Sequence, residues 1–112
     1  MDDPDKLLEN LTQELNRGTL VLSVLLSTES RIYGYALVTR LKEQGMEVEQ
    51  NTLYPLLRRL EKQGLLESAW DTTDARPRRY YAVSEGGRQI RTKLLTSWKK
   101  MNSSIIALEE TL

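Results

Sequence analysis

The strongest constraint on this chain is a stripe of apolar residues along its last 28 positions. The stripe recurs at spacings of four or three and consists of Ile90, Leu94, Trp98, Met101, Ile105, Leu108 and Leu112. Such spacing is typical of a helix that packs along a heptad seam. A helix of 28 residues is about 42 Å long, whereas a domain of about 100 residues has a radius of gyration of only about 13 Å. The helix should therefore extend beyond its own domain, and its seam predicts a homodimer, with these residues from Leu94 onward at the interface.

The rest of the chain suits one soluble domain. The whole chain has 112 residues, of which 39% are hydrophobic and 29% charged. Cysteine and histidine are both absent, which excludes disulfides, iron–sulfur clusters and cysteine zinc sites and removes the commonest general base. The first residues lack the pattern of a signal peptide, and the longest apolar run, Leu20 to Leu26, is far shorter than a membrane span. We expect a cytoplasmic protein with no cofactor, no metal and no membrane association.

Charge is distributed unevenly along the chain, although its net value is zero. Residues 1–16 carry one basic and five acidic residues, and residues 17–50 are balanced. Residues 51–100 carry eleven basic and five acidic residues, and residues 101–112 carry two acids. The middle of the chain is therefore basic, and local charge decides polyanion binding more than net charge does.

Helical signals occupy the first half of the chain. A first helix is expected over about residues 3–16, where Asp3 can act as the cap and Pro4 suits the first helical position. Residues 19–27 are apolar nearly all round, as in a helix at the centre of a core. Residues 30–33 read as a short connection, and a second core helix follows over 35–44. A third runs from about 50 to 63, with Pro55 in its first turn or just after it.

The periodicity then changes to that of strands. Residues 65–70 and 78–83 are short apolar or aromatic runs separated by a polar turn, which predicts a hairpin. Ser84 is a plausible cap for the final helix. The order of elements is that of a mostly α winged helix-turn-helix with a two-stranded wing. We expect a DNA-binding domain over residues 1–83 and a dimerisation helix over 84–112.

The helix over residues 50–63 has two contrasting faces. Leu53, Leu56, Leu57 and Leu60 share one face, and the opposite face and its flanks carry Asn51, Thr52, Tyr54, Pro55, Arg58, Arg59 and Lys62. A helix with one buried face and guanidinium, ammonium and amide groups on the other suits the major groove of DNA. Arg58 is suited to guanine and Asn51 to adenine. The alternative interpretation is an ordinary solvated helix surface.

The tip of the predicted hairpin is also basic. Arg76, Arg78 and Arg79 surround Pro77, and phosphates beside the groove would satisfy their charge. Salt bridges to Asp71 and Asp74 in the same loop are the alternative. Tyr80 and Tyr81 point to opposite faces of the strand, so at least one of them should belong to the core.

Three motifs together resemble the PadR family of bacterial transcriptional regulators. They are Tyr33-Gly34-Tyr35, the run from Thr52-Leu53-Tyr54-Pro55 to Glu67, and Arg78-Arg79-Tyr80-Tyr81 followed by Ser84-Glu85-Gly86-Gly87-Arg88. The resemblance covers roughly residues 17–100. It implies a homodimeric winged-helix repressor of double-stranded DNA whose C-terminal helix dimerises. The chain has Asn51 where the family usually has glycine.

The chain is also similar to the short-C-terminus branch of that family, which includes multidrug-binding regulators. That similarity implies a planar aromatic effector at the dimer centre, held by Trp98 and its symmetry mate with Leu95, Met101 and Asn102 nearby. The alternative is that Trp98 is only part of the dimer core.

Two other function classes remain open at this stage. A winged-helix dimer that holds another protein is favoured by the zero net charge. An enzyme is disfavoured, because adjacent acids such as Glu109 and Glu110 do not converge on one site of a helix, and no phosphate-binding loop or nucleophile motif occurs.

Overall fold

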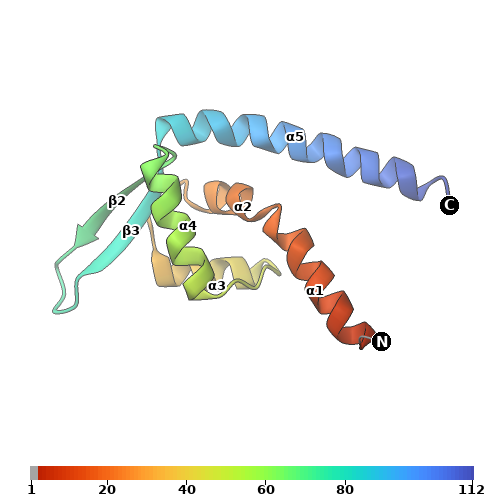
Figure 1. Cartoon of the computed structure of the whole chain (residues 1–112). Helices are drawn as coiled ribbons and strands as arrows, with labels where there is room; N and C mark the ends of the chain where they lie inside the picture. The colour runs from red at the N-terminus through yellow and green to blue at the C-terminus, as the bar shows by residue number, and fades with distance from the viewer. Residues whose placement is uncertain (1–2) are drawn as a thin grey trace.

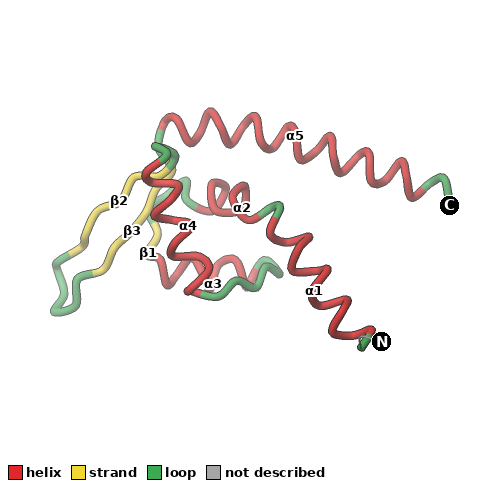
Figure 2. Tube along the Cα trace, viewed as in Figure 1, coloured by secondary structure: helices red, strands yellow, loops and turns green. Residues whose placement is uncertain are grey.

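A computed structural model describes residues 3–112 as five helices and a small antiparallel sheet (Figures 1 and 2). The elements in chain order are α1 (Pro4–Arg17), α2 (Leu20–Ser27), β1 (Ile32–Tyr33), α3 (Gly34–Glu43), α4 (Gln50–Lys62), β2 (Leu66–Asp71), β3 (Arg78–Val83) and α5 (Glu85–Glu109). The predicted winged helix-turn-helix with a long C-terminal helix is therefore confirmed. Every helix in residues 3–112 is too short or too polar to span a bilayer.

The core lies between α2, α3, α4 and the sheet. Helix α4 buries the four leucines that the periodicity singled out, and α2 contributes its most apolar positions. The buried cluster consists of Val24, Leu25, Ile32, Leu37, Leu41, Leu53, Leu56, Leu57, Leu60, Leu66, Tyr81 and Val83. Tyr81 is buried and Tyr80 half-buried, as the strand alternation predicted. Burial of these side chains fixes which face of α4 is left for solvent.

The sheet contains one strand that the sequence did not indicate. Strand β3 lies in the centre, with β2 on one side and β1 on the other. Strand β1 has only two residues, and its Ile32 pairs with Tyr81. We expected residues 30–33 to be a connection, because a run this short carries no periodicity. Its pairing with a strand nearly fifty residues later stabilises it.

Local signals at the helix ends are largely confirmed. The Asp3 carboxylate accepts from the Asp5 amide, and the Ser84 hydroxyl accepts from the Gly87 amide. Gly64 follows α4 with a φ of +79°, a conformation that glycine adopts without steric cost. Pro55 is the sixth residue of α4, just after its first turn, as expected. Because proline has no N–H, the Asn51 carbonyl lacks its usual helical donor, and Asn51 is exposed.

The start of α5 is seated firmly on the winged domain. Ser84 donates to the Gly64 carbonyl, and a Cβ placed on Gly87 would lie only 2.1 Å from the Leu65 carbonyl oxygen. The Glu29 carboxylate, just after α2, lies 2.7 Å from Nη1 of Arg91 and 3.4 Å from Nε of Arg88, both on α5. The first turns of α5 are therefore fixed in direction.

Beyond that seat, α5 and α1 both extend from the same side of the molecule (Figure 1). The radius of gyration is 16.5 Å and the principal extents are 56 × 35 × 23 Å, larger than a compact chain of this length would give. The predicted overhang is confirmed. Helix α1 buries none of its residues and leaves large apolar side chains exposed, namely Leu7, Leu8, Leu11 and Leu15.

Candidate nucleic-acid interface

The outward face of α4 carries the predicted polar and basic residues. Tyr54 is half-buried against α3, and the others on this face are exposed: Asn51, Thr52, Pro55, Arg58, Arg59 and Lys62. In residues 3–112, no ion pair within 4.0 Å engages Arg58, Arg59 or Lys62. The basic groups of α4 are therefore available to an external anion.

The three wing arginines differ from one another in their surroundings. Arg76 is exposed and belongs to none of the ion pairs of the described residues. Arg78 is paired weakly with Asp74, with 3.9 Å between Nη2 and Oδ2 and both side chains largely exposed. Arg79 is bound inside the domain. The alternative of salt bridges within the loop thus holds for Arg78 alone, and only loosely.

Arg79 connects the wing to α4. Its Nη2 donates to Oε1 of Glu61 on α4 at 2.8 Å, and its Nε donates to the Ser68 hydroxyl on β2 at 3.1 Å. Ser68 in turn donates to Glu61. The guanidinium also lies 5.7 Å from the ring centroids of Trp70 and Tyr81. These contacts make Arg79 a positioning residue for the wing, with its charge largely satisfied by Glu61.

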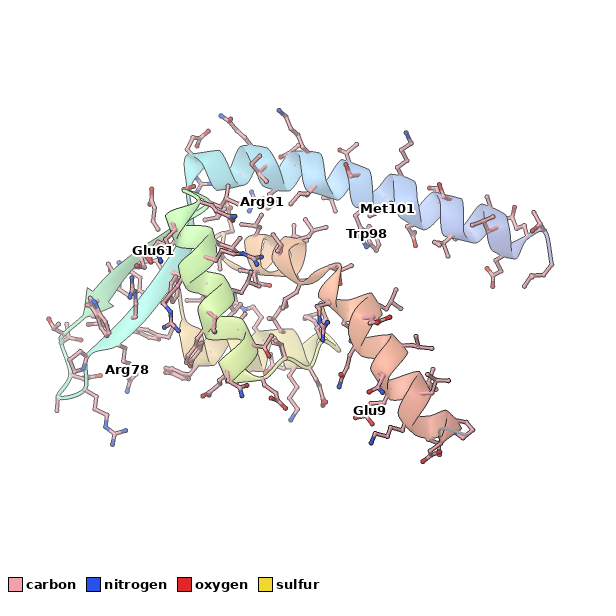
Figure 3. The ribbon with its side chains drawn as sticks, in the orientation of Figure 1. Glu9, Glu61, Arg78, Arg91, Trp98 and Met101 are labelled. Carbon is pink, nitrogen blue, oxygen red and sulfur yellow. The ribbon has the colours of Figure 1, made fainter. Side chains whose placement is uncertain are left out.

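A second network lies near the tip of the wing, where Asp71 and Arg78 form the last strand pair before the turn. The Tyr33 hydroxyl donates to Oδ2 of Asp71 at 2.5 Å, and Tyr33 stacks on Tyr35 with ring centroids 5.8 Å apart. This hydrogen bond, together with those from Thr73, lowers the pKa of Asp71 to about 2. The hydrogen bond to Asp71 in turn raises the pKa of Tyr33. The Arg78 guanidinium lies 5.6 Å and 5.8 Å from the centroids of the two tyrosine rings, which orient its side chain. Figure 3 shows Arg78 on the wing.

Between α4 and the wing lies an open groove of about 420 Å³. Its lining includes Arg58 from α4, Arg78 and Arg79 from the wing, and the aromatic rings of Tyr35, Tyr54 and Trp70. Tyr35 is 50% exposed and Trp70 is 60% exposed. Trp70 was not among the predicted site residues, and Tyr35 was noted only within the Tyr-Gly-Tyr motif. The exposed aromatic residue in a strand was the one available signal for Trp70.

Within residues 3–112, the apolar seam of α5 is only partly covered. Leu94 and Trp98 are 36% and 37% exposed, and Met101, Ile105 and Leu108 are more exposed still. The final helix was expected to reach the end of the chain, but α5 ends at Glu109, so Leu112 lies beyond it and not on its stripe. Leu95 is half-buried and Asn102 is exposed. Trp98 extends from the side of α5 that faces α1 (Figure 3). In residues 3–112, no group of three or more acidic side chains is arranged to hold a metal ion.

Comparison with known proteins shows which protein family the chain belongs to. Residues 21–93, from α2 into α5, match the Transcriptional regulator PadR-like family. The chain belongs to this family. The PadR-like chain is also 35% identical over 82 residues to transcriptional regulator Rv3488 of Mycobacterium tuberculosis, a match that covers 72% of this chain and 77% of that protein. The resemblance inferred from the three motifs is therefore confirmed.

Solved structures of PadR proteins have the same fold as this chain. A PadR family transcriptional regulator from Eggerthella lenta has a TM-score of 0.91 and 42% identity, covering 96% of each chain. Bacillus subtilis PadR, solved in complex with operator DNA, has a TM-score of 0.64 and 20% identity over 69% of this chain and 45% of its own. The latter likeness concerns the fold alone. The PadR-like chain is thus a transcriptional regulator with a DNA-binding winged-helix fold.

Proposed function

We propose that this PadR-like regulator is a homodimeric repressor that binds a pseudo-palindromic operator in double-stranded DNA. The observation that carries the proposal is the exposed basic face of α4 beside the basic wing. Arg58 and Lys62 lie on that face, and Arg76 and Arg78 lie on the wing. A helix in the major groove and a wing at the adjacent backbone would engage both sets.

Within this proposal the residues have distinct roles. Arg58 reads guanine, Asn51 reads adenine, and Thr52, Tyr54 and Pro55 lie at the entry of the helix into the groove. Arg59, Lys62, Arg76 and Arg78 contact phosphates, which position the protein and supply most of the salt-dependent affinity. Arg79 acts through the wing, because Glu61 already satisfies its guanidinium at 2.8 Å.

The dimer is formed by the two overhanging helices. Two stripes are exposed, one on α5 over residues 94–108 and one on α1 over residues 7–15. Exposed large apolar stripes on helices of one soluble chain are typical of an interface. A second copy would cover both stripes. Two α4 helices related by a two-fold axis would then read half-sites about 34 Å apart.

An effector would bind where the two copies meet. Trp98, Leu95, Met101 and Asn102 lie on consecutive turns of α5, and two copies would bring two indoles together. Aromatic and methionine side chains make adaptable apolar sites. A planar aromatic compound between the two Trp98 rings would shift the angle between the α5 helices and weaken operator binding. Planar cationic dyes that leave Trp98 fluorescence unchanged would argue against this site.

A gel-shift titration with DNA from upstream of the chain's own gene tests the proposal. We expect a saturable complex with one preferred duplex, resistant to unrelated competitor DNA, whose affinity falls steeply between 50 and 200 mM salt. A weak shift that is the same for every sequence would favour the alternative, a winged-helix dimer that holds another protein. Sedimentation of the free protein determines whether it is a dimer.

A further inference from the structure

A cavity of about 260 Å³ lies between α1 and the loop that joins α3 to α4. Figure 1 shows this loop reaching toward α1. The last turns of α1 and the first residue of α2 line one part of the cavity, and the loop and the start of α4 line the rest. The volume is just below the usual range for drug-sized ligands, so the cavity suits a smaller molecule.

The apolar wall of this cavity consists of Leu20, Met46 and Val48. All three are partly buried and pack against the core of the winged domain. The loop that carries Met46 is held in place, because the Met46 amide donates to the Leu41 carbonyl at 2.8 Å and the Met46 Sδ lies 3.0 Å from the Ser23 hydroxyl. The apolar wall is therefore preformed, and it offers a surface for an aliphatic group.

The charged groups of the cavity have opposite signs and come from different elements. Arg17 lies at the end of α1, and Glu47 and Glu49 lie on the loop before α4. All three side chains are exposed, and within residues 3–112 no ion pair within 4.0 Å engages any of them. The cavity thus has a free cation on one element and free carboxylates on the other. A molecule with one anionic and one cationic group would satisfy both.

The cavity lies away from the apolar stripe of α1. At 3.6 residues per turn, Gln13 and Asn16, which line the cavity, are on the opposite side of α1 from Leu7, Leu11 and Leu15. A second copy that covers the leucines would therefore leave the cavity open.

We propose that this cavity binds a zwitterionic α-amino acid with an aliphatic side chain, one per protomer. The carboxylate of the ligand would accept from the Arg17 guanidinium, and its ammonium group would donate to Glu47 and Glu49. The aliphatic side chain would pack on the apolar wall. A simple anion or a simple cation would leave one side of the cavity unsatisfied, and the two carboxylates would repel a polyanion such as DNA.

The regulatory consequence rests on the proposed function. Helix α1 buries none of its residues and is joined to the winged domain through Gly18 and Thr19. An amino acid held between Arg17 and Glu49 would fix the direction of α1 relative to that domain. Because α1 carries one of the two stripes of the proposed dimer, binding of the amino acid and dimerisation should strengthen each other.

Calorimetric titration of the full chain with L-leucine tests the site. Two analogues serve as matched probes: 3-methylbutylamine lacks the carboxylate of leucine, and 4-methylpentanoate lacks its amino group. We expect one leucine per protomer and about tenfold or weaker binding of each analogue, because each leaves one charged side of the cavity without a partner.

Substitutions at the charged groups give the second arm of the test. Arg17→Gln, and the double variant Glu47→Gln with Glu49→Gln, should each weaken leucine binding about tenfold or more. Arg76→Gln and Glu43→Gln remove the same kinds of charge outside the cavity and should leave leucine binding unchanged. All five side chains are exposed, so the substitutions should leave the fold intact, and thermal melts without ligand check this.

The absence of leucine binding, equal binding of leucine and either analogue, or wild-type binding by Arg17→Gln or by the double variant would overturn the proposal. Sedimentation with saturating leucine tests the coupling. We expect the dimer dissociation constant to fall several-fold with leucine and to stay unchanged with 4-methylpentanoate. An unchanged constant with leucine bound would overturn the coupling.

The two proposals fail in different ways. A dimer that binds its operator but not leucine would overturn the cavity site alone. Leucine binding by a chain that is monomeric at every concentration would leave the cavity site standing and overturn the proposed dimer.

Discussion

Nη2 of Arg79 lies 2.8 Å from Oε1 of Glu61, which joins the middle of the wing to the recognition helix. Both side chains are about a third exposed or less, and Ser68 completes the link from β2. The wing therefore cannot shift relative to α4 without breaking a charge-assisted hydrogen bond. If the wing and α4 bind the same duplex, this link fixes the spacing between their contacts.

Glu61→Gln tests that link. Removal of an acid raises the net charge by one, which by itself should strengthen DNA binding. Loss of the link should instead weaken operator binding, roughly tenfold, and lower the free energy of unfolding by about 1–2 kcal/mol. Glu67→Gln on β2 makes the same charge change at an exposed site and is the matched control in gel-shift titrations. Equal strengthening by both variants would show that the link has no role in positioning.

Arg58→Ala and Lys62→Ala separate base recognition from phosphate contact. Both residues are exposed on the same face of α4. Arg58→Ala should cost about 1–3 kcal/mol on the preferred operator and relax selection at one base position. Lys62→Ala should weaken binding evenly across sequences and reduce the salt dependence by about one phosphate. Selection from a randomised duplex pool measures both effects, and an even loss with Arg58→Ala would make Arg58 a phosphate contact.

Gly87→Ala should disrupt the packing of the first turn of α5 against the residue that follows α4 and against β3. The added methyl group would lie 2.1 Å from the Leu65 carbonyl oxygen and 2.7 Å from Cγ2 of Val83. We expect a loss of about 1–3 kcal/mol or more in the free energy of unfolding, measured by urea titration. Gly86→Ala is the control, because its nearest neighbour, the Gly64 carbonyl oxygen, would be 3.6 Å away. Alanine is the better helix former, so Gly86→Ala should be neutral or stabilise by up to about 1 kcal/mol.

Ile105→Asp should dissociate the proposed dimer. Ile105 is 64% exposed in the single chain, so the substitution leaves the fold of the protomer unchanged. A carboxylate buried in an apolar seam should raise the dimer dissociation constant about tenfold or more. Sedimentation across a concentration series measures this constant. Ser103→Asp introduces the same charge two positions earlier, on the opposite side of α5, and should have little effect; equal dissociation by both would count against the seam.

The ion pairs of Glu29 with Arg88 and Arg91 on α5 predict that the stability of a Glu29 variant relative to the wild type depends on pH. The hydrogen bond from Arg91, and the charge of Arg88, hold the pKa of Glu29 below its usual value of 4.5. A carboxylate whose folded pKa is lowered stabilises the protein above its unfolded pKa, and that contribution is lost as pH falls through the folded pKa. Glu29→Gln should therefore melt at a lower temperature than the wild type at pH 7, by a small amount because the pair is partly exposed.

The difference in melting temperature should shrink as pH falls from about 5 to 3. Glu43→Gln, an exposed acid on α3, should match the wild type at every pH. If the difference in melting temperature stays constant across this range, the contribution of Glu29 depends on the shape of its side chain and not on its charge.

Much of the fold could be predicted from the sequence because its signals are local. The spacing of Leu53, Leu56, Leu57 and Leu60 defined the buried face of α4, and thus also the exposed one. Asp3 and Ser84 marked helix starts through hydrogen bonds to amides two and three residues away. The overhang of α5 followed from helix length alone. The family followed from three short motifs.

The remaining features depend on contacts between segments far apart in the chain. Arg79 was expected at phosphates or beside Asp71 and Asp74, yet it lies on Glu61, eighteen residues away. Strand β1 and the groove exist only because β3 brings Tyr33 and Tyr35 beside the wing. Periodicity and capping determined which elements form and which faces are apolar, because these depend on neighbours within a few residues. Tertiary packing alone decided which charges remain free, because a charge is satisfied by whichever group the fold brings within hydrogen-bonding distance.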